Sequence, residues 1–476
     1  MAMKMQLRVT PETKTRKMFE TVPFPLNFTL YIFNVTNKDE VLAGGKPILQ
    51  EIGPYYFEEH KEKFDIVDNK DEDTVEYEFK NTYQYKPNKN GPGLTGDEIV
   101  TVVHPFLLST ILLIKIERPQ LLDFIHKSVN GILHNPQDIF FTGRLWDFLY
   151  DGIFLDCSSN EFEVIAACSE LDSGNYREVK RFNETAFKFS MFGTQNGSSI
   201  GRYKAFRGKK NIRDVGRVVE YNGITEMDAW YEDECNEITG TDGTIFPPFA
   251  EKEEGFSIFI PQMCSVMTAE YHSPSKYAGF KTNHYTFSFD VTKYGSPNCY
   301  CRDGEFCPPK GIIDLFPCLG TPIALSAPHF LNVDPTVRDK VIGLSPDQEK
   351  HFAGTPVKVN ARVQINVDVT PVENIPFMKN LQPMHFPVLW FDSAFELPKK
   401  YVNMLKYQLI LGLKIKNWIK FGCIFGGLFG VVLGAVLYIF QDDGEKHETR
   451  TISTKSDSNK LIDNPQVLSI EVISNE

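Results

Sequence analysis

Alternation between apolar and polar residues is the strongest pattern along this chain, and it predicts β-strands. In each such segment the apolar side chains fall on one face, as in a strand that covers a core on one side only. The clearest segments are residues 75–79, 187–191, 285–291 and 363–369. Clusters of turn-forming residues at 88–93 and 239–243 separate strands. The pattern as a whole predicts a mainly β, antiparallel protein.

A helical period appears in one region of the chain. After Pro119, apolar residues recur at three- and four-residue spacing at Leu121, Leu122, Ile125, Val129, Ile132 and Leu133. A second short helix is expected over residues 144–150, with Leu145, Phe148 and Leu149 facing inward. We therefore expect a helical insert over residues 119–150 of the β domain.

One apolar run near the C-terminus is long enough to cross a membrane. Residues 421–440 carry no charge, and at about 1.5 Å per residue such a helix matches the roughly 30 Å hydrocarbon core. We assign the transmembrane helix to residues 414–440 and expect residues 441–476 to form a disordered cytoplasmic tail. Within the run, four glycines recur every fourth residue and predict a face for close helix packing: Gly422, Gly426, Gly430 and Gly434.

The orientation of this helix follows from features other than its flanking charge, which is ambiguous because lysines crowd the N-terminal side. Four N-glycosylation sequons precede the helix, at Asn27, Asn34, Asn183 and Asn196. Eight of the nine cysteines precede it as well. Both observations predict that residues 21–413 form an extracellular domain. Residues 1–20 contain no apolar stretch that could direct export, so we expect a truncated chain that lacks an N-terminal anchor, in preference to unconventional export.

Composition and short motifs give little support for an enzyme. The net charge is −12 and no long basic stretch occurs, which argues against a nucleic-acid partner. Ser199 lies in a G-x-S-x-G motif that overlaps the Asn196 sequon, and a hairpin turn is the favoured interpretation over a nucleophile elbow. The G-x-G-x-x-G motif at 91–96 lacks a preceding buried strand, and no cofactor is expected. The 38 phenylalanines predict a deep core in preference to an apolar cavity.

Eight cysteines are expected to form disulfides. They are Cys157, Cys168, Cys235, Cys264, Cys299, Cys301, Cys307 and Cys318. Zinc is disfavoured because no pair has the usual ligand spacing, but spacing alone does not settle the connectivity.

Longer motifs carry a resemblance to a known family. They are FPLNFTLYIFNVTN (24–37), EIGPYYFEE (51–59), GTDGTIFPPF (240–249), CYCRDGEFCPPKGIIDLFPC (299–318) and PHFLNVDP (328–335). Together they resemble the class B scavenger receptor family. Within that family the chain is most similar to the insect sensory neuron membrane proteins, a similarity to which the segments at 142–152 and 214–223 add.

The resemblance implies a large antiparallel β-barrel ectodomain, an apolar tunnel through it, and a helical cap far from the membrane. It also implies the pairs Cys235–Cys299, Cys264–Cys318 and Cys301–Cys307. We expect Cys157 to bond to Cys168 and Cys423, within the membrane span, to stay a free thiol. Relatives that bind anionic lipid carry a lysine in the cap. The corresponding stretch here, 134–138, has none, which favours a neutral ligand.

These inferences predict a cell-surface receptor or transfer protein for hydrophobic ligands, not an enzyme. The expected partners are a lipid, pheromone or odorant, the membrane, an odorant receptor channel and an odorant carrier protein. Candidate cap contacts are Phe124, His126, Lys127, His134 and Arg144, although solvated surface charge is the simpler interpretation of the polar ones. The alternatives are a receptor for lipid or lipoprotein uptake, a lysosomal lipid exporter, an adhesion or scaffold glycoprotein with a filled barrel, and an esterase using Ser199.

Overall fold

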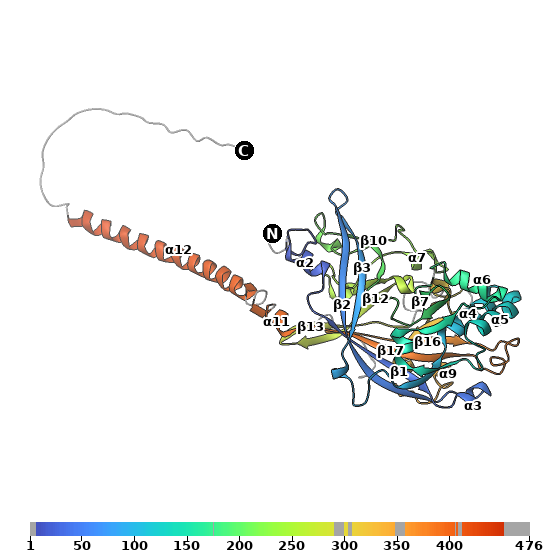
Figure 1. The fold of residues 1–476 in the computed structure, drawn as a ribbon. Helices are drawn as coiled ribbons and strands as arrows, with labels where there is room; N and C mark the ends of the chain where they lie inside the picture. The colour runs from blue at the N-terminus through green and yellow to red at the C-terminus, as the bar shows by residue number, and fades with distance from the viewer. Residues whose placement is uncertain are drawn as a thin grey trace. The chain divides into compact units, whose positions relative to one another are not determined.

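The computed structural model describes residues 6–174, 176–289, 299–302, 307–347, 358–404, 406–407 and 412–451. The chain divides into two compact units, which we call unit 1 (Met1–Leu397) and unit 2 (Pro398–Glu476). All strands of the described residues belong to unit 1, and Figure 1 shows the order of its elements.

A nine-stranded sheet forms the main part of unit 1, in the order β10-β9-β3-β2-β1-β17-β16-β15-β14. Its strands are β1 (Leu26–Val35), β2 (Leu49–Asn69), β3 (Thr74–Tyr85), β9 (Ser199–Phe206), β10 (Val218–Tyr221), β14 (Ile312–Asp314), β15 (Ile323–Ser326), β16 (Lys358–Val369) and β17 (Met384–Glu396). Every ladder in it is antiparallel, which confirms the strand pattern of the sequence.

Three smaller antiparallel sheets complete the strand inventory of the described residues. They are β4 (Ile99–Val103) with β5 (Phe140–Arg144), β6 (Ile153–Asp156) with β8 (Ala186–Phe189) and β7 (Val179–Asn183), and β11 (Phe256–Ile260) with β12 (Ser265–Tyr277) and β13 (Phe280–Thr286). The strand expected over 285–291 is therefore only partly formed, because β13 ends at Thr286 and residues 290–291 lie outside the described ranges.

The expected closed barrel is not found, because the edge strands β10 and β14 do not pair with each other in the described residues. The ladder beyond β10 is reduced to single bridges: Arg217 pairs with Thr241, and Thr241 pairs with Ile258 of β11. One residue, Thr241, thus takes the place of a strand beside β10, and β13 does not pair with β14 in the described residues either. The sheet is open, with β11–β13 as a separate sheet.

The centre of the sheet is the pairing of β1 with β17. Tyr31 stands opposite Trp390, and the two rings stack with centroids 3.9 Å apart. Phe28 stacks on Phe391 at 5.3 Å. Such cross-strand aromatic pairs each add about 0.5–1.5 kcal/mol beyond the burial of their area. The Trp390 indole also donates to Glu51 Oε2 at 2.8 Å, which fixes β2 to the same core.

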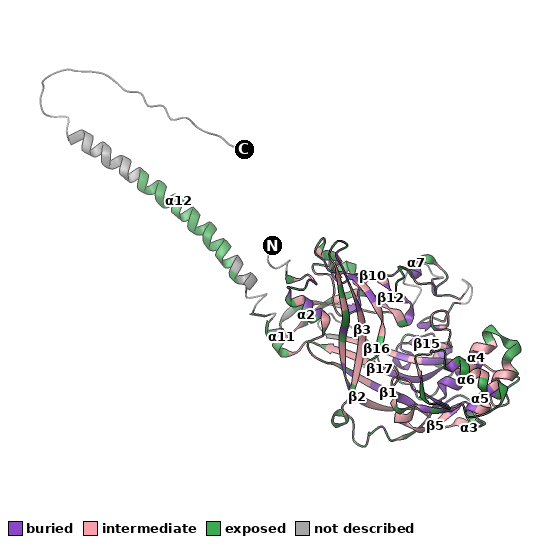
Figure 2. Cartoon of the chain, turned by 45° about the horizontal axis from the view of Figure 1, so that its top comes forward, coloured by how far each residue is buried: buried purple, intermediate pink, exposed green. Residues whose placement is uncertain are grey.

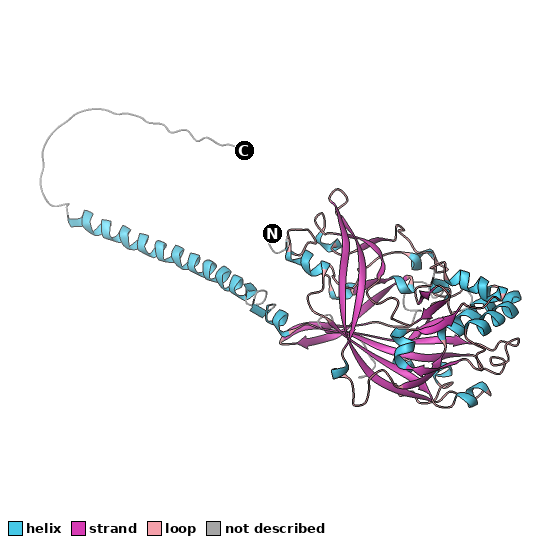
Figure 3. Ribbon diagram, in the orientation of Figure 1, coloured by secondary structure: helices cyan, strands magenta, loops and turns pink. Residues whose placement is uncertain are grey.

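Three helices of unit 1 pack together, α4 (Pro105–Glu117), α5 (Leu122–Ile132) and α6 (Phe162–Leu171), and we call them the helix cluster (Figure 3). The other α-helices of unit 1 are short: α2 (Lys14–Glu20), α3 (Lys38–Leu42), α7 (Asp233–Asn236), α8 (Phe316–Leu319) and α9 (Pro335–Arg338). Single-turn segments are η1 (Pro87–Lys89), η2 (Pro119–Leu121), η3 (Asp147–Asp151), η4 (Ile212–Asp214), η5 (Lys252–Glu254), η6 (Pro261–Met263) and η8 (Pro328–Phe330).

The predicted helical insert is only partly correct. The helix after Pro119 is confirmed as η2 and α5, and Leu145, Phe148 and Leu149 are fully buried as expected. Arg144, however, ends strand β5, and the helical turn that follows is Asp147–Asp151. The apolar run at 106–114 is helical too, since it forms most of α4.

A buried ion pair joins the N-terminal residues to the sheet. Lys63 Nζ of β2 lies 3.0 Å from Asp242 Oδ2 and donates to the Phe19 carbonyl of α2 at 2.9 Å. The Tyr77 hydroxyl donates to the same Asp242 oxygen at 2.7 Å. Burial opposes ionisation of Asp242, but Lys63 and the hydrogen bonds from Thr244 and Tyr77 outweigh it and lower the pKa of the carboxyl. Asp242, in the GTDGT segment at 240–244, therefore binds this segment to β2 and β3 in the interior of unit 1.

Unit 2 contains α11 (Lys399–Met404) and α12 (Gly412–Thr451). Within α12, the 21-residue segment Trp418–Tyr438 is long and apolar enough to cross a membrane, and its side chains are exposed (Figure 2). At 1.5 Å per residue this segment measures about 31 Å. The helix continues to Thr451, beyond the predicted end at 440, and residues 452–476 of the predicted tail lie outside the described residues.

His104 begins α4 and gives a pH-dependent contribution to stability. Its Nδ1 accepts from the Leu107 amide at 3.4 Å, and Pro105 follows in the first turn. Burial lowers the pKa of His104 from 6.5 to about 4, against smaller opposing effects of its own backbone and of Asp138. Folding therefore favours the neutral ring.

We expect His104→Asn to flatten the acid dependence of stability. The unfolded chain takes up a proton on His104 near pH 6.5 and the folded chain only near pH 4, so stability is complete above the first value and falls as the pH drops. The difference amounts to about 2 kcal/mol between about pH 7 and about pH 5. Asparagine keeps a helix-capping oxygen but does not titrate. Thermal unfolding of both proteins across this range measures the effect, and parallel curves would contradict it.

Candidate ligand cavity

A cavity of about 1670 Å³ lies inside unit 1. Strands from both halves of the open sheet contribute to its wall: Tyr83 and Tyr221 from one half, Val363 and Phe391 from the other. The sheet must therefore curve strongly, because its two halves face the same space. Ile258 of β11 and Met267 of β12 also line the cavity, so the small sheet walls part of the space that the main sheet leaves open.

The wall is apolar because the strand period places apolar residues on this side. Ala361, Val363 and Ile365 alternate along β16, and all three line the cavity. Gln364 and Asn366, which lie between and beyond them, are fully buried and bond to each other at 2.8 Å. The alternation that predicted β16 from sequence thus also predicts which of its residues can contact an apolar ligand.

The helix cluster forms another part of the wall. α4 contributes Phe106, Ser109 and Leu113, and α5 contributes the stripe Ile125, Val129 and Ile132, which are among the apolar positions that predicted the helix. Residues Ala167 and Leu171 of α6 line the cavity beside them. Sequence reasoning missed α4 and α6 as cavity walls.

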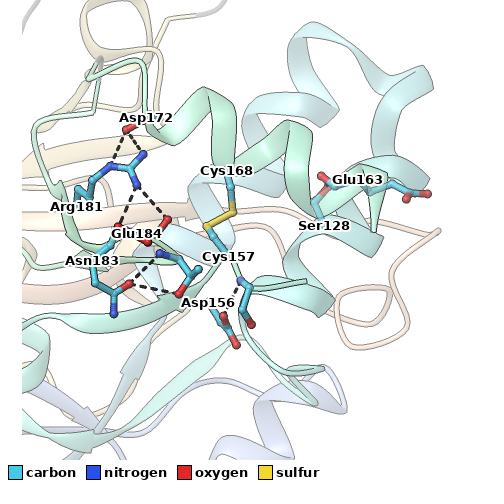
Figure 4. The surroundings of a disulfide bond; sticks show 11 residues. Ser128, Asp156, Cys157, Glu163, Cys168, Asp172, Arg181, Asn183 and Glu184 are labelled. Atoms are coloured by element: carbon cyan, nitrogen blue, oxygen red, sulfur yellow. Dashed lines mark hydrogen bonds and ion pairs between the residues drawn. A yellow bond between two sulfur atoms is a disulfide. The ribbon is translucent and has the colours of Figure 1, made fainter. Parts of the chain in front are cut away.

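Local bonds hold α6 in place (Figure 4). A disulfide joins Cys157, just after β6, to Cys168 of α6. On the other side the Ser128 hydroxyl of α5 donates to the Glu163 carbonyl at 2.8 Å, and Lys127 pairs with the Glu163 carboxylate at 3.2 Å. These contacts fix the helix that carries Ala167 and Leu171.

The structure contains three further disulfides, Cys235–Cys299, Cys264–Cys318 and Cys301–Cys307, which are the pairs that the resemblance implied. Cys264 and Cys318 line the cavity and connect the start of β12 to α8. Glu232 and Glu234 lie close to the Cys235–Cys299 sulfurs, but the disulfide leaves no thiolate for a metal ion.

Carboxylates surround the part of the cavity formed by the helix cluster. Glu117 of α4 and Glu170 of α6 both line the cavity, as does Tyr176. Burial, then Glu170 and Glu117, raise the pKa of the Tyr176 phenol. Lys115 points elsewhere, because its Nζ donates to the Pro371 carbonyl at 2.7 Å. Arg177 also lines the cavity next to Tyr176, but Glu117, Glu170 and Glu178 outnumber it, so the charged residues lining this end are mostly acidic.

None of the five predicted cap contacts lines the cavity. Phe124 packs edge-on against Phe162, and His126 lies beside Phe377. Lys127 pairs with Glu163, His134 lies 3.4 Å from Asp156, and Arg144 bonds to Asp97, Asp147 and Asp151. Any role for these residues would be on the surface, and it stays a prediction. The apolar residues at helical spacing in α5 were a better guide to the cavity wall than these five residues, because Ile125, Val129 and Ile132 line it.

The four sequon asparagines differ in their surroundings. Asn196 is half-buried and pairs with the Tyr83 backbone: its Oδ1 accepts from the amide at 2.7 Å, and its Nδ2 donates to the carbonyl at 3.2 Å. Asn34 accepts from the Thr101 amide at 2.8 Å. Asn183 is exposed and bonds only through Oδ1, within its own turn, to Thr185. Asn27 is exposed and has no side-chain hydrogen bond to a described residue.

The misleading motifs have structural roles. The Ser199 hydroxyl donates to Glu78 and accepts from the Gly201 amide at 3.0 Å, within β9. In the 91–96 motif, Gly96 lies against Trp146, and its amide donates to Glu98 at 2.8 Å.

In α12, Cys423 is a free and exposed thiol. The packing of another helix on the glycine face stays a prediction. A Cβ atom built on Gly422, Gly426, Gly430 or Gly434 would meet no atom of the described residues within 4 Å, so this face is open.

Comparison with known proteins identifies the family of this chain. The model of the CD36 family matches residues 1–438. Sensory neuron membrane protein 1 of Aedes aegypti is 42% identical over 442 residues, covering 91% of this chain and 81% of the relative. The proteins of the same name from Anopheles gambiae and Manduca sexta are 41% and 36% identical, covering 94% and 98% of this chain and 83% and 89% of theirs. The chain belongs to the CD36 family.

Proposed function

We propose that this protein is a cell-surface receptor that binds a hydrophobic molecule in its cavity and passes it to the membrane or to a co-receptor. The observation that carries the proposal is the cavity of about 1670 Å³ with its mostly apolar wall. Burying alkyl surface is worth about 0.8 kcal/mol per CH2, so a chain of about ten carbons has enough binding energy for micromolar affinity.

In this proposal the helix cluster acts as a cap that admits the ligand, and the curved sheet acts as the tunnel wall. Support comes from the continuity of the lining, which runs from Ser109 and Ile125 in the helices to Tyr221 and Val363 in the strands. The setting is pheromone or odorant detection, with an odorant carrier protein and an odorant receptor channel as partners. The names of the relatives, sensory neuron membrane proteins, support this setting.

The charges near the helix cluster favour a neutral ligand. Glu117, Glu170 and Glu178 line the cavity against one cation, Arg177. The two lysines of the helix cluster, Lys115 and Lys127, are bound elsewhere, to the Pro371 carbonyl and to Glu163. A carboxylate that entered here would meet like charge in a partly desolvated site. Long-chain alcohols, esters and aldehydes avoid this cost. Uptake of anionic lipid and ligand-free scaffolding remain the competing functions that a binding experiment separates.

We expect neutral chains of about ten carbons to bind, and a ring added to the cavity wall to weaken their binding. Ser109→Phe at α4 and Ala361→Phe at β16 each put a ring into the space. The loss of burial of about two methylene groups would weaken binding about tenfold. Displacement of a fluorescent lipid from the purified protein by alcohols and esters measures this. Mass spectrometry of molecules extracted from the same sample identifies any bound lipid.

Ser173→Phe is the matched control, because Ser173 is exposed and does not line the cavity. Equal displacement from all variants, or none from the unmodified protein, would contradict the proposal and favour a scaffold. Stronger displacement by carboxylates than by alcohols would favour uptake of anionic lipid instead.

The proposed topology places unit 1 outside the cell, with α12 as its anchor, and it predicts which sequons carry glycans. Glycosylation converts the asparagine side chain into a secondary amide, whose trans form puts the sugar on the same side as Oδ1. In Asn196 the position on the same side as Oδ1 is taken by the Nδ2 hydrogen that is donated to the Tyr83 carbonyl. The cis form would cost about 2.5 kcal/mol, and losing both bonds to Tyr83 would cost about 0.5–1.5 kcal/mol each.

We therefore expect glycans on Asn27 and Asn183 and none on Asn196. Enzymatic deglycosylation in heavy-oxygen water, followed by peptide mass spectrometry, reads out each site. Asn183→Gln should lower the mass of the intact protein by one glycan, and Asn196→Gln should leave it unchanged. An occupied Asn196 in folded protein at the cell surface would refute the site assignment, and a protein without any glycan would refute the topology.

A further inference from the structure

The β12–β13 hairpin ends next to the point where the chain leaves unit 1. The Tyr277 hydroxyl donates to Glu396 Oε1 at 3.3 Å and to the Leu397 carbonyl at 3.4 Å. Leu397 is the last residue of unit 1, and the helix that contains the membrane segment begins at Gly412. The hairpin tip therefore lies at the end of unit 1 from which the chain continues to its membrane anchor.

Two lysines face each other at this tip. Lys276 of β12 stands directly opposite Lys281 of β13 in the ladder, and both are exposed. Neither makes an ion pair with a described residue, although most lysines of the long β2–β3 hairpin do. Like charges directly opposite each other destabilise a strand pair. Nothing in the described part of the fold compensates for this pair.

The turn between the two lysines is also unfavourable by itself. Ala278 has φ 49° and Gly279 has φ 89°, so both central residues of this two-residue loop are in the left-handed region. Such turns prefer Asn or Gly at the first of these positions, and alanine there is strained. Charge repulsion and backbone strain thus coincide at one exposed tip. A feature that lowers stability at a surface indicates a role in contacts outside the chain.

The chain that follows Leu397 carries charge of the same sign. Residues 398–420 contain Lys399, Lys400, Lys406, Lys414, Lys416 and Lys420 and no acidic residue. This is the flank whose lysines made the orientation of α12 ambiguous from charge alone. The chemical group that complements lysines beside a membrane span is the phosphate of a lipid headgroup.

We propose that the tip of the β12–β13 hairpin, residues 276–281, rests on the phospholipid surface, with Lys276 and Lys281 bound to headgroup phosphates. The tip then forms a second contact with the bilayer beside the anchor and limits the tilt of unit 1. A phosphate between the lysines removes their repulsion, and the tight turn presents both side chains on the same face of the hairpin. This inference rests on α12 as a membrane span and is independent of ligand binding.

The test uses the full chain with Cys423→Ser, so that a single new cysteine carries a fluorophore. The label is placed at Ala278→Cys on the tip or at Gln137→Cys, an exposed position after α5. Both proteins are reconstituted in phosphatidylcholine nanodiscs that contain headgroup-nitroxide phosphatidylcholine. We expect several-fold stronger quenching at position 278 than at 137. Equal quenching at both positions overturns the proposal.

Charge reversal tests the role of the lysines. Lys276→Glu with Lys281→Glu should reduce quenching at position 278 at least to half, whereas Lys276→Arg with Lys281→Arg should preserve it. Lys46→Glu with Lys180→Glu is the matched control, because both residues are exposed, have no ion pair with a described residue, and give the same change in net charge. Quenching at position 278 that is insensitive to the reversal overturns the assignment of phosphate contacts. Loss of ligand displacement in these variants is not expected.

Discussion

The pairing of β1 with β17 is the constraint on which the rest of unit 1 depends. These are the first and last strands of the unit, and they lie side by side at the centre of its main sheet. Because they are antiparallel, with Asn27 opposite Ala394, β1 begins and β17 ends at the same end of the sheet. The Tyr31 and Trp390 rings stack across this pairing, and a one-residue shift of β1 against β17 would turn Tyr31 to the other face of the sheet and break the stack.

The opposite end of the same strands receives the helix cluster. β16 ends at Val369 opposite Met384, where β17 begins, and Lys115 of α4 is bonded to the Pro371 carbonyl just beyond that point. The cavity is bounded by these helices and by strands from both halves of the sheet. The Lys63–Asp242 ion pair connects β2 to the segment that bridges β10 and β11, so it supports the curvature on which the cavity depends. A flat sheet of the same strands could not enclose that volume.

How far the sequence predicted this structure depends on what each residue contacts. β3 was predictable because it is covered on one face only, so its alternation survives in the sequence. β16 is buried on both faces, but it was predictable because polar Gln364 and Asn366, which bond to each other, alternate with its apolar cavity residues. α5 was predictable for the same reason as β3, at helical spacing. α4 was not, since Pro105 to Leu108 are all buried and the helix has no polar face to reveal its period. The sheet stays open at two places: β10 continues only through the single bridges of Thr241, and β14 does not pair with β13 in the described residues. The Asn196–Tyr83 pairing joins segments far apart in sequence. None of these features has a local signal.

The two ends of unit 1 differ in charge, and this difference bears on how a ligand would move between them. Glu117 and Glu170 lie at the helix cluster, and Lys276 and Lys281 lie at the end where the chain leaves the unit. An anion would be repelled at the first end and retained at the second, whereas a neutral chain gains nothing from the field and responds only to apolar burial. Net movement of a neutral ligand then requires a sink at the basic end, and a bilayer or a co-receptor beside the anchor supplies one. The proposed transfer therefore needs unit 1 held close to the membrane, which is what a second lipid contact at the β12–β13 tip provides.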